Sequence, residues 1–132
     1  MQPAGAKFSF PQRHRLKSSL QIKKIVCARQ SVTKYPIKCF FEILPSEDDC
    51  EGLKIAFLVS KRKFKHATDR NRVKRLLREA FRLNKHQISL PEKATLNMCW
   101  MFIGDAIPTF QQVETAAIDI FVKINNFQKS QQ

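Results

Sequence analysis

The side chains best equipped for chemistry in this chain are cations, and they are concentrated between residues 61 and 86. Eleven Lys and Arg residues lie there against two acids, Asp69 and Glu79, which leaves a local charge of +9. Clustered cations bind phosphate groups, and they do so at a strength that depends on salt. This stretch indicates a polyanionic partner, with nucleic acid as the first candidate and an anionic membrane surface as the second.

The spacing within residues 69–85 predicts that most of these cations lie on one side of a helix. The apolar residues recur every three or four positions, as in a helix docked on a core; they are Val73, Leu76, Leu77, Ala80 and Phe81. The opposite face carries Asn71, Lys74, Arg75, Arg78, Arg82 and Lys85. Because like charges held together repel each other, this face is expected to meet a polyanion.

Residues that catalyse reactions do not gather in the same way. His14, His66 and His86 are scattered, and the sequence contains no glycine-rich phosphate loop, His-x-x-x-His pair or nucleophile elbow. The acids cluster only at 47–51, without the spacing of a calcium loop. The pattern therefore favours an RNA- or DNA-binding module over a self-sufficient enzyme, and predicts no cofactor bound by the protein alone.

Length and composition predict one domain over residues 1–132, with mobile ends at 1–14 and 125–132. Hydrophobic residues make up 43% of the chain, enough for a core, and the net charge is +13. The four cysteines lack Cys-x-x-Cys spacing and are expected to be small buried residues in a reducing cytosol. No signal peptide or membrane-length apolar run is present, so we expect a cytoplasmic protein.

Two further helices are predicted beside the basic one. Ser18 and Gln21 form a capping-box pattern before a first amphipathic helix, and Thr109 and Gln112 form another before a C-terminal helix. Either Thr68 or Asp69 is expected to cap the basic helix.

Three apolar runs predict strands at 37–44, 53–60 and 96–103. The second strand is expected to be central and antiparallel to the first, across a hairpin loop at 45–52. Because the basic helix lies between the second and third strands, these two are predicted to run parallel in one sheet.

The first of these strands has one apolar face, while Lys38, Phe40 and Glu42 share the other. An aromatic ring beside a cation on an open sheet can stack on a nucleobase. Alternatively, a helix covers that face and Phe40 belongs to the core. The pattern alone leaves both interpretations open.

Two runs, Leu53 to Arg62 and Arg70 to Arg82, resemble the bacterial ribonuclease P protein subunit. The family signature is a Val-Ser-Lys-Lys strand end followed by an Arg-Asn-Arg helix, and here the residues are Val59-Ser-Lys-Arg62 and Arg70-Asn-Arg72. The resemblance implies an α+β fold, an α/β sandwich like the second domain of a small-subunit ribosomal protein. Its central sheet is mainly antiparallel, with an N-terminal helix, a left-handed βαβ crossover through the basic helix, and a C-terminal helix.

The resemblance also implies a function. In ribonuclease P an RNA carries out the hydrolysis that removes the 5′ leader from precursor tRNA, with Mg²⁺ in the ribonucleoprotein. The partners would be ribonuclease P RNA and the leader, with no membrane and no required protein partner. Residues that would bind the catalytic RNA are Lys61, Arg62, Arg70, Asn71, Arg72, Lys74, Arg75, Arg78 and Arg82. A cleft between the first helix and the sheet would bind the leader through Ile22, Val26, Lys38 and Phe40.

The chain departs from the family pattern at several positions. The family often carries two Phe on the first helix, where this chain has Ile22 and Val26, and Arg62 replaces a common Lys. Asp69 stands where an apolar residue is usual. Because aliphatic side chains stack poorly on bases, the leader contact is expected to be weaker or differently distributed. The rival hypotheses are a non-enzymatic, ribosomal-type protein that binds structured RNA, and a DNA-binding protein.

Overall fold

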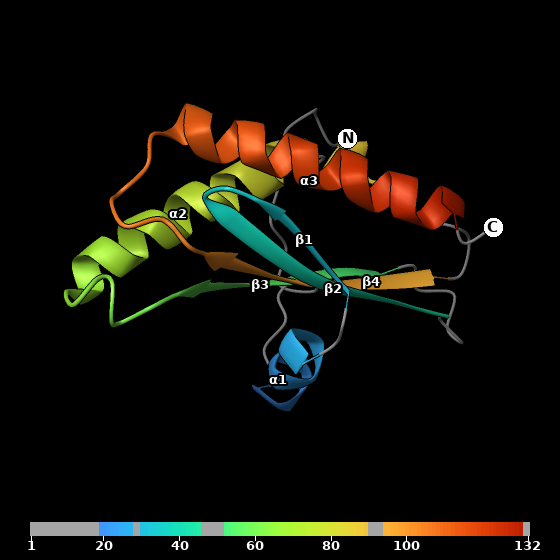
Figure 1. Ribbon diagram of the computed structural model, residues 1–132, viewed down its shortest axis with the longest axis horizontal. Helices are drawn as coiled ribbons and strands as arrows, with labels where there is room; N and C mark the ends of the chain where they lie inside the picture. The colour runs from blue at the N-terminus through green and yellow to red at the C-terminus, as the bar shows by residue number, and fades with distance from the viewer. Residues whose placement is uncertain (1–18, 28–29, 46–51, 90–93, 131–132) are drawn as a thin grey trace, which may run out of the picture.

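The computed structural model describes residues 19–27, 30–45, 52–89 and 94–130, and arranges them as a sheet with helices on both faces (Figure 1). In chain order the elements are α1 Ser19–Cys27, β1 Ser31–Lys34, β2 Ile37–Pro45, β3 Gly52–Val59, α2 Ala67–Asn84, the 3-10 turn η3 Lys85–Gln87, β4 Ala94–Phe102 and α3 Phe110–Ser130. The predicted α+β class is confirmed. The predicted helices and three strands all form, and the short strand β1 was not predicted.

The four strands follow the order β1-β2-β4-β3. The pairs β1–β2 and β2–β4 are antiparallel, and β3 runs parallel to β4, as predicted. The hand of the crossover through α2 stays a prediction. The expectation that β3 is central and paired with β2 is wrong, because β4 lies between them. Nearly every residue of β4 is buried, whereas β3 exposes Lys54, so the more continuously apolar strand occupies the centre. The hairpin loop predicted at 45–52 is therefore not a hairpin, and its residues 46–51 lie outside the described ranges.

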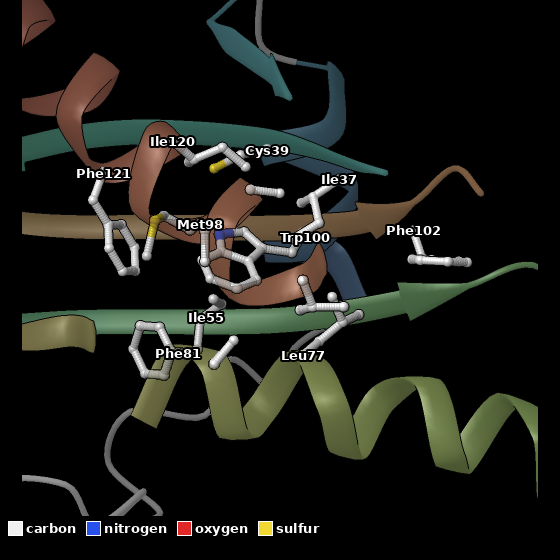
Figure 2. Close-up of a cluster of buried hydrophobic side chains, with 14 of the residues drawn as sticks. Ile37, Cys39, Ile55, Leu77, Phe81, Met98, Trp100, Phe102, Ile120 and Phe121 are labelled. Atoms are coloured by element: carbon white, nitrogen blue, oxygen red, sulfur yellow. The ribbon is translucent and has the colours of Figure 1, made fainter. Parts of the chain in front are cut away.

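The main core lies between the sheet and the pair α2 and α3 (Figure 2). Trp100 of β4 is at its centre, fully buried. The centroid of its ring system lies 5.9 Å from that of Phe81 on α2, 5.6 Å from that of Phe121 on α3 and 5.8 Å from that of Phe57 on β3. Such pairs add about 0.5–1.5 kcal/mol each beyond the burial of their area. These contacts join both helices to the sheet, and so fix the position of α2.

A smaller cluster lies on the opposite face, under α1. Ile25, Ala56 and Cys99 are buried there. The prediction that cysteines are buried free thiols is confirmed for Cys39 and Cys99, while Cys50 and the side chain of Cys27 are outside the described part of the chain. Burial raises the pKa of the Cys99 thiol to about 12. Burial, and then the nearby Cys99, raise the pKa of Cys39, which the Trp100 indole partly offsets.

The predicted helix ends are right for α3 at its start and wrong for α2. Thr109 and Gln112 form the capping box, with backbone-to-side-chain distances of 3.0 and 3.2 Å. Neither Thr68 nor Asp69 caps α2, because the helix begins earlier, after His66, which has no side-chain cap. Instead the His66 carbonyl accepts hydrogen bonds from the first turn.

The C-terminal end of α3 also differs from the prediction, because the helix continues through Ser130 instead of fraying from residue 125. Phe127 packs on Phe41 of β2, with 5.2 Å between ring centroids, and this contact anchors the last turns to the sheet. The predicted capping residue Ser18 and the predicted mobile segment 1–14 lie outside the described residues.

Candidate RNA interface

The helix α2 presents its cations because its other side is held in the core. Its buried residues are Val73, Leu77, Ala80, Phe81 and Asn84. At about 100° per residue, Arg75 lies opposite this stripe. The predicted RNA-binding residues that the structure exposes on α2 are Asn71, Arg72, Arg75 and Arg78. Together they form the outer face of α2, which points away from the sheet.

Two other predicted residues of α2 are only partly exposed. Lys74 lies at the flank of the buried stripe. Arg82 donates a hydrogen bond from Nε to the Glu79 carboxylate at 3.1 Å, and its Nη2 makes a second, shorter contact with the same group. The hydrogen bond from Arg82 lowers the pKa of Glu79, and the pKa of Arg82 is raised in return. This pair offsets charge near the C-terminal end of α2, so Arg82 contributes less to the positive field than predicted.

Arg70 has a different role from the neighbouring arginines. Its Nη1 donates to the carbonyl oxygens of Phe64 at 2.8 Å and Lys65 at 3.1 Å. Arg70 precedes Val73 by three positions and Leu77 by seven, so it lies on the apolar side of α2 and turns back towards the preceding loop. The spacing of Arg70 from Val73 and Leu77 already indicates that it lies on the apolar side of the helix, although the family motif assigns Arg70 to RNA contact. In this structure Arg70 positions the loop.

That loop, residues 60–66, is called here the basic loop. Phe64 is its anchor: the side chain is buried, and its ring centroid lies 5.8 Å from that of Phe102 on β4. The backbone N–H of Phe64 donates to the Ser60 carbonyl at 3.1 Å, which closes a turn. Lys61 and Arg62, both predicted RNA-binding residues, are therefore exposed on a held turn rather than on a loose segment.

Lys63, which was not among the predicted site residues, makes a second set of contacts that holds the basic loop in place. Its Nζ donates to the Ile103 carbonyl at 2.7 Å and lies 3.3 Å from the Asp105 carboxylate. The positive end of the α2 dipole opens onto the same loop and adds to its potential. The basic loop and the outer face of α2 thus form one continuous cationic surface.

The four predicted leader-binding residues also come together, on the other face of the sheet. Ile22 and Val26 of α1 pack beside Phe40 of β2, and all three are half-buried. Lys38 Nζ lies 5.1 Å from the Phe40 ring centroid, within range of a cation–π contact. Of the two interpretations of Phe40, the structure supports a part of each, because the residue packs on the small cluster under α1 and yet is only half-buried.

The two surfaces lie on opposite sides of the sheet (Figure 1). The basic loop follows β3 at one edge of the sheet, and β4 separates that strand from Lys38 and Phe40 on β2. Lys54 of β3 is exposed and shares the α1 side with Ala56, and its cross-strand neighbour Asn97 donates to Glu42 at 3.3 Å. Sequence reasoning missed Lys54, although the alternation along β3 indicates its side. It adds an exposed cation near the start of β3, on the α1 side of the sheet.

Other kinds of site are absent from residues 19–27, 30–45, 52–89 and 94–130 in two respects. Within them, no group of three or more His, Cys, Asp or Glu side chains is placed to hold a metal ion. The helices there include none with the length and apolar character needed to cross a membrane.

Comparison with known proteins agrees with this geometry. The family model for ribonuclease P matches residues 10–123. The ribonuclease P protein component of Porphyromonas gingivalis is 32% identical over 122 residues, which cover 90% of this chain and 88% of that protein.

Solved structures show the same fold. The ribonuclease P protein of Thermotoga maritima aligns with a TM-score of 0.65 at 21% identity, over 84% of this chain and 97% of that one. The Staphylococcus aureus protein aligns with a TM-score of 0.61 at 20% identity, over 84% of this chain and 94% of that one. From the family match and the conserved architecture together, we conclude that this chain belongs to the ribonuclease P protein family.

Proposed function

We propose that this chain, a protein component of the tRNA-processing ribonuclease P, is the docking subunit of that ribonucleoprotein. The outer face of α2 and the basic loop bind the catalytic RNA. One observation carries this proposal: exposed Asn71, Arg72, Arg75 and Arg78 stand on a helix whose opposite side is fixed in the core. A rigid helix can present several cations to phosphates without first ordering them, which reduces the entropy lost on binding.

The α1 side of the sheet binds the 5′ leader of precursor tRNA. The half-buried Phe40 ring offers a stacking surface, Lys38 supplies a cation over that ring, and Ile22 and Val26 close one side. Stacking of one base on an aromatic ring contributes about 1–3 kcal/mol. With aliphatic residues on α1, Phe40 is the one ring among these four residues, so the leader contact concentrates there.

The hydrolysis is carried out by the RNA, with Mg²⁺ present in the ribonucleoprotein. The basic surface of the protein supplies charge rather than proton transfer, since an arginine side chain is not deprotonated in proteins. The protein thus acts by holding the RNA and the substrate together, in the cytoplasm and without a required protein partner.

A cleavage assay tests this function. Precursor tRNA is incubated with the protein, with the catalytic RNA from the same genome, or with both, at low and at high Mg²⁺. We expect no cleavage by the protein alone, and strong stimulation of the RNA by the protein at low Mg²⁺, because protein cations replace part of the required metal. If the protein leaves cleavage by that RNA unchanged at low Mg²⁺, the proposal is overturned.

A binding measurement separates this function from a general RNA-binding role. A ribosomal-type protein uses the same basic face but has no reason to prefer leader-bearing tRNA. We expect the assembled ribonucleoprotein to bind precursor tRNA more tightly than mature tRNA. Equal affinity for the two would support the ribosomal-type alternative instead.

A further inference from the structure

A cavity of about 490 Å³ lies at the end of the molecule where α2 begins, and neither the outer face of α2 nor the four leader-binding residues line it. It is formed by the β1–β2 turn, the segment 103–109 and the first turns of α3, which Figure 1 shows at the same end as the start of α2. The backbone N–H of Ile103 donates to the Pro36 carbonyl at 2.8 Å, so the turn and the segment are joined. The volume of the cavity falls in the range of small-molecule binding sites.

The floor of the cavity is aromatic and depends on a glycine. Phe102 lines it, and a Cβ on Gly104 would lie 2.7 Å from Cζ of that ring. Real Cβ atoms do not approach other atoms so closely, so any other residue at position 104 would displace the Phe102 ring. At the rim, the Tyr35 side chain is 66% exposed, the largest exposed fraction among the large hydrophobic residues described. A flat apolar ligand fits between such a floor and such a rim.

The remaining wall is mixed, with Lys34 as its one charged residue and the apolar Ala106, Ile107 and Pro108 beside neutral polar side chains. It includes Thr109, Gln111 and Thr115, whose hydroxyl and amide groups can both donate and accept hydrogen bonds. The nearby cations are already paired: Lys34 lies 3.4 Å from Asp119 and Lys63 lies 3.3 Å from Asp105. A phosphate would meet these carboxylates as well as the cations. The cavity therefore suits a neutral planar ring that carries donors and acceptors at its edge.

The cavity is joined to the basic loop through contacts of its floor and of segment 103–109, although no residue of that loop lines it. Phe64 of that loop packs on Phe102, the ring that forms the floor. Lys63 of the loop bonds the carbonyl of Ile103, next to Gly104. These contacts place the cavity next to the loop that carries Lys61 and Arg62, so we infer that RNA bound to these two residues can also reach the cavity.

We propose that this cavity binds one unpaired nucleobase of the catalytic RNA, stacked against Tyr35 and hydrogen-bonded by the polar side chains at the start of α3. The inference rests on the proposed docking function and extends the RNA-binding surface from α2 to α3. Proteins that recognise single-stranded RNA use the same combination of aromatic stacking and contacts to base edges.

The test compares Tyr35→Ala with Tyr35→Phe, which keeps the ring, in binding to the catalytic RNA. Val122→Ala is the matched control, because Val122 is 50% exposed and does not line the cavity. We expect Tyr35→Ala to weaken binding by about 5- to 100-fold at fixed salt, the range for losing one stacked base. Tyr35→Phe and Val122→Ala should stay within about twofold of the wild type, since neither removes a ring.

Two further measurements identify what the cavity holds. The salt dependence of binding should be the same for Tyr35→Ala and wild type, because no phosphate contact is removed. In 2′-hydroxyl acylation of the RNA, an unpaired nucleotide protected by the wild-type protein should regain reactivity with Tyr35→Ala. Ala106→Trp, which fills the exposed mouth of the cavity, should have the same effect as Tyr35→Ala.

The possible failures are distinguishable. If the wild-type protein does not bind the catalytic RNA, the docking function itself is overturned, and this inference with it. If Tyr35→Ala and Ala106→Trp both bind the catalytic RNA as well as the wild type does, the docking function stands and the nucleobase site is overturned. The same result is expected if the cavity binds a protein partner instead of RNA. A reduced salt dependence in Tyr35→Ala would indicate a phosphate contact and would also overturn the nucleobase assignment.

Discussion

The two faces of the sheet are built in different ways. The face under α2 and α3 encloses a large aromatic core around Trp100, whereas the face under α1 has three buried residues and several half-buried ones. The first arrangement makes α2 a rigid platform for fixed cations. The second leaves apolar and aromatic surface accessible beside a short helix. A rigid array suits a folded RNA whose phosphates are in place, and a partly exposed apolar surface suits a flexible single strand.

Trp100→Ala should have the largest effect, and should act through stability. Removing this side chain from between α2, α3 and β3 is expected to lower the free energy of unfolding by about 3–5 kcal/mol. Cys99→Ala, at the next position but on the α1 face, should cost about 1 kcal/mol, because it leaves a much smaller cavity. Urea denaturation of both variants measures the difference. Equal losses would show that the two faces support the fold equally.

Phe40→Ala should weaken leader binding by about 1–3 kcal/mol, because it removes the ring on which a base would stack. The affinity of the holoenzyme for precursor tRNA should fall, while its affinity for mature tRNA should not. Ile22→Phe adds a second aromatic ring to the half-buried residues around Phe40. It should therefore raise the affinity for precursor tRNA. A parallel loss for precursor and mature tRNA in Phe40→Ala would mean that Phe40 serves only the fold.

Arg70→Lys tests whether Arg70 acts by positioning the basic loop or only by its charge. The variant keeps the cation but loses the fork that bonds two loop carbonyls, so the basic loop should become mobile. We expect a loss of about 1 kcal/mol in affinity for the catalytic RNA, on the scale of one hydrogen bond. Amide hydrogen exchange in residues 61–66 should speed up. If exchange there is unchanged, Arg70 does not position the loop.

Arg75→Ala should have the smallest effect on affinity but a specific one on salt dependence. Loss of one phosphate contact lowers the slope of log K against log salt by about 0.7–0.9. Lys123→Ala is the matched control, because it removes one exposed cation from α3, outside the proposed surface. Its slope should match that of the wild type. A slope in Arg75→Ala equal to that of the control would show that the outer face of α2 is only solvated.

Local spacing predicted much of this structure, and long-range pairing accounts for the errors. The stripe from Val73 to Phe81 places α2 correctly, because one helix turn is enough to define its faces. The position of β3 depends on which strand is most completely buried, and so on residues of β4 that lie 43 positions further along the chain. The strand β1 was missed because it is four residues long and mostly exposed, and forms by pairing with β2.

The site shows the same limit. The motif from Arg70 to Arg72 identifies the surface but assigns all three residues to RNA contact. In the structure Arg70 donates to the Phe64 carbonyl of the basic loop, whereas Arg72 is exposed. The cavity beside Tyr35 has no sequence signal, because its walls come from segments around residues 35, 104 and 111.

The strand order also has a consequence for synthesis of the protein. The strand β3, which leads into the basic helix, pairs in the sheet with β4, and β4 ends at Phe102. On a ribosome that has not yet translated β4, the chain therefore contains all the arginines of α2 but lacks the strand that carries Trp100. Without that support α2 cannot dock its apolar side. The nascent chain thus acquires a fixed RNA-binding surface only after β4 has been translated.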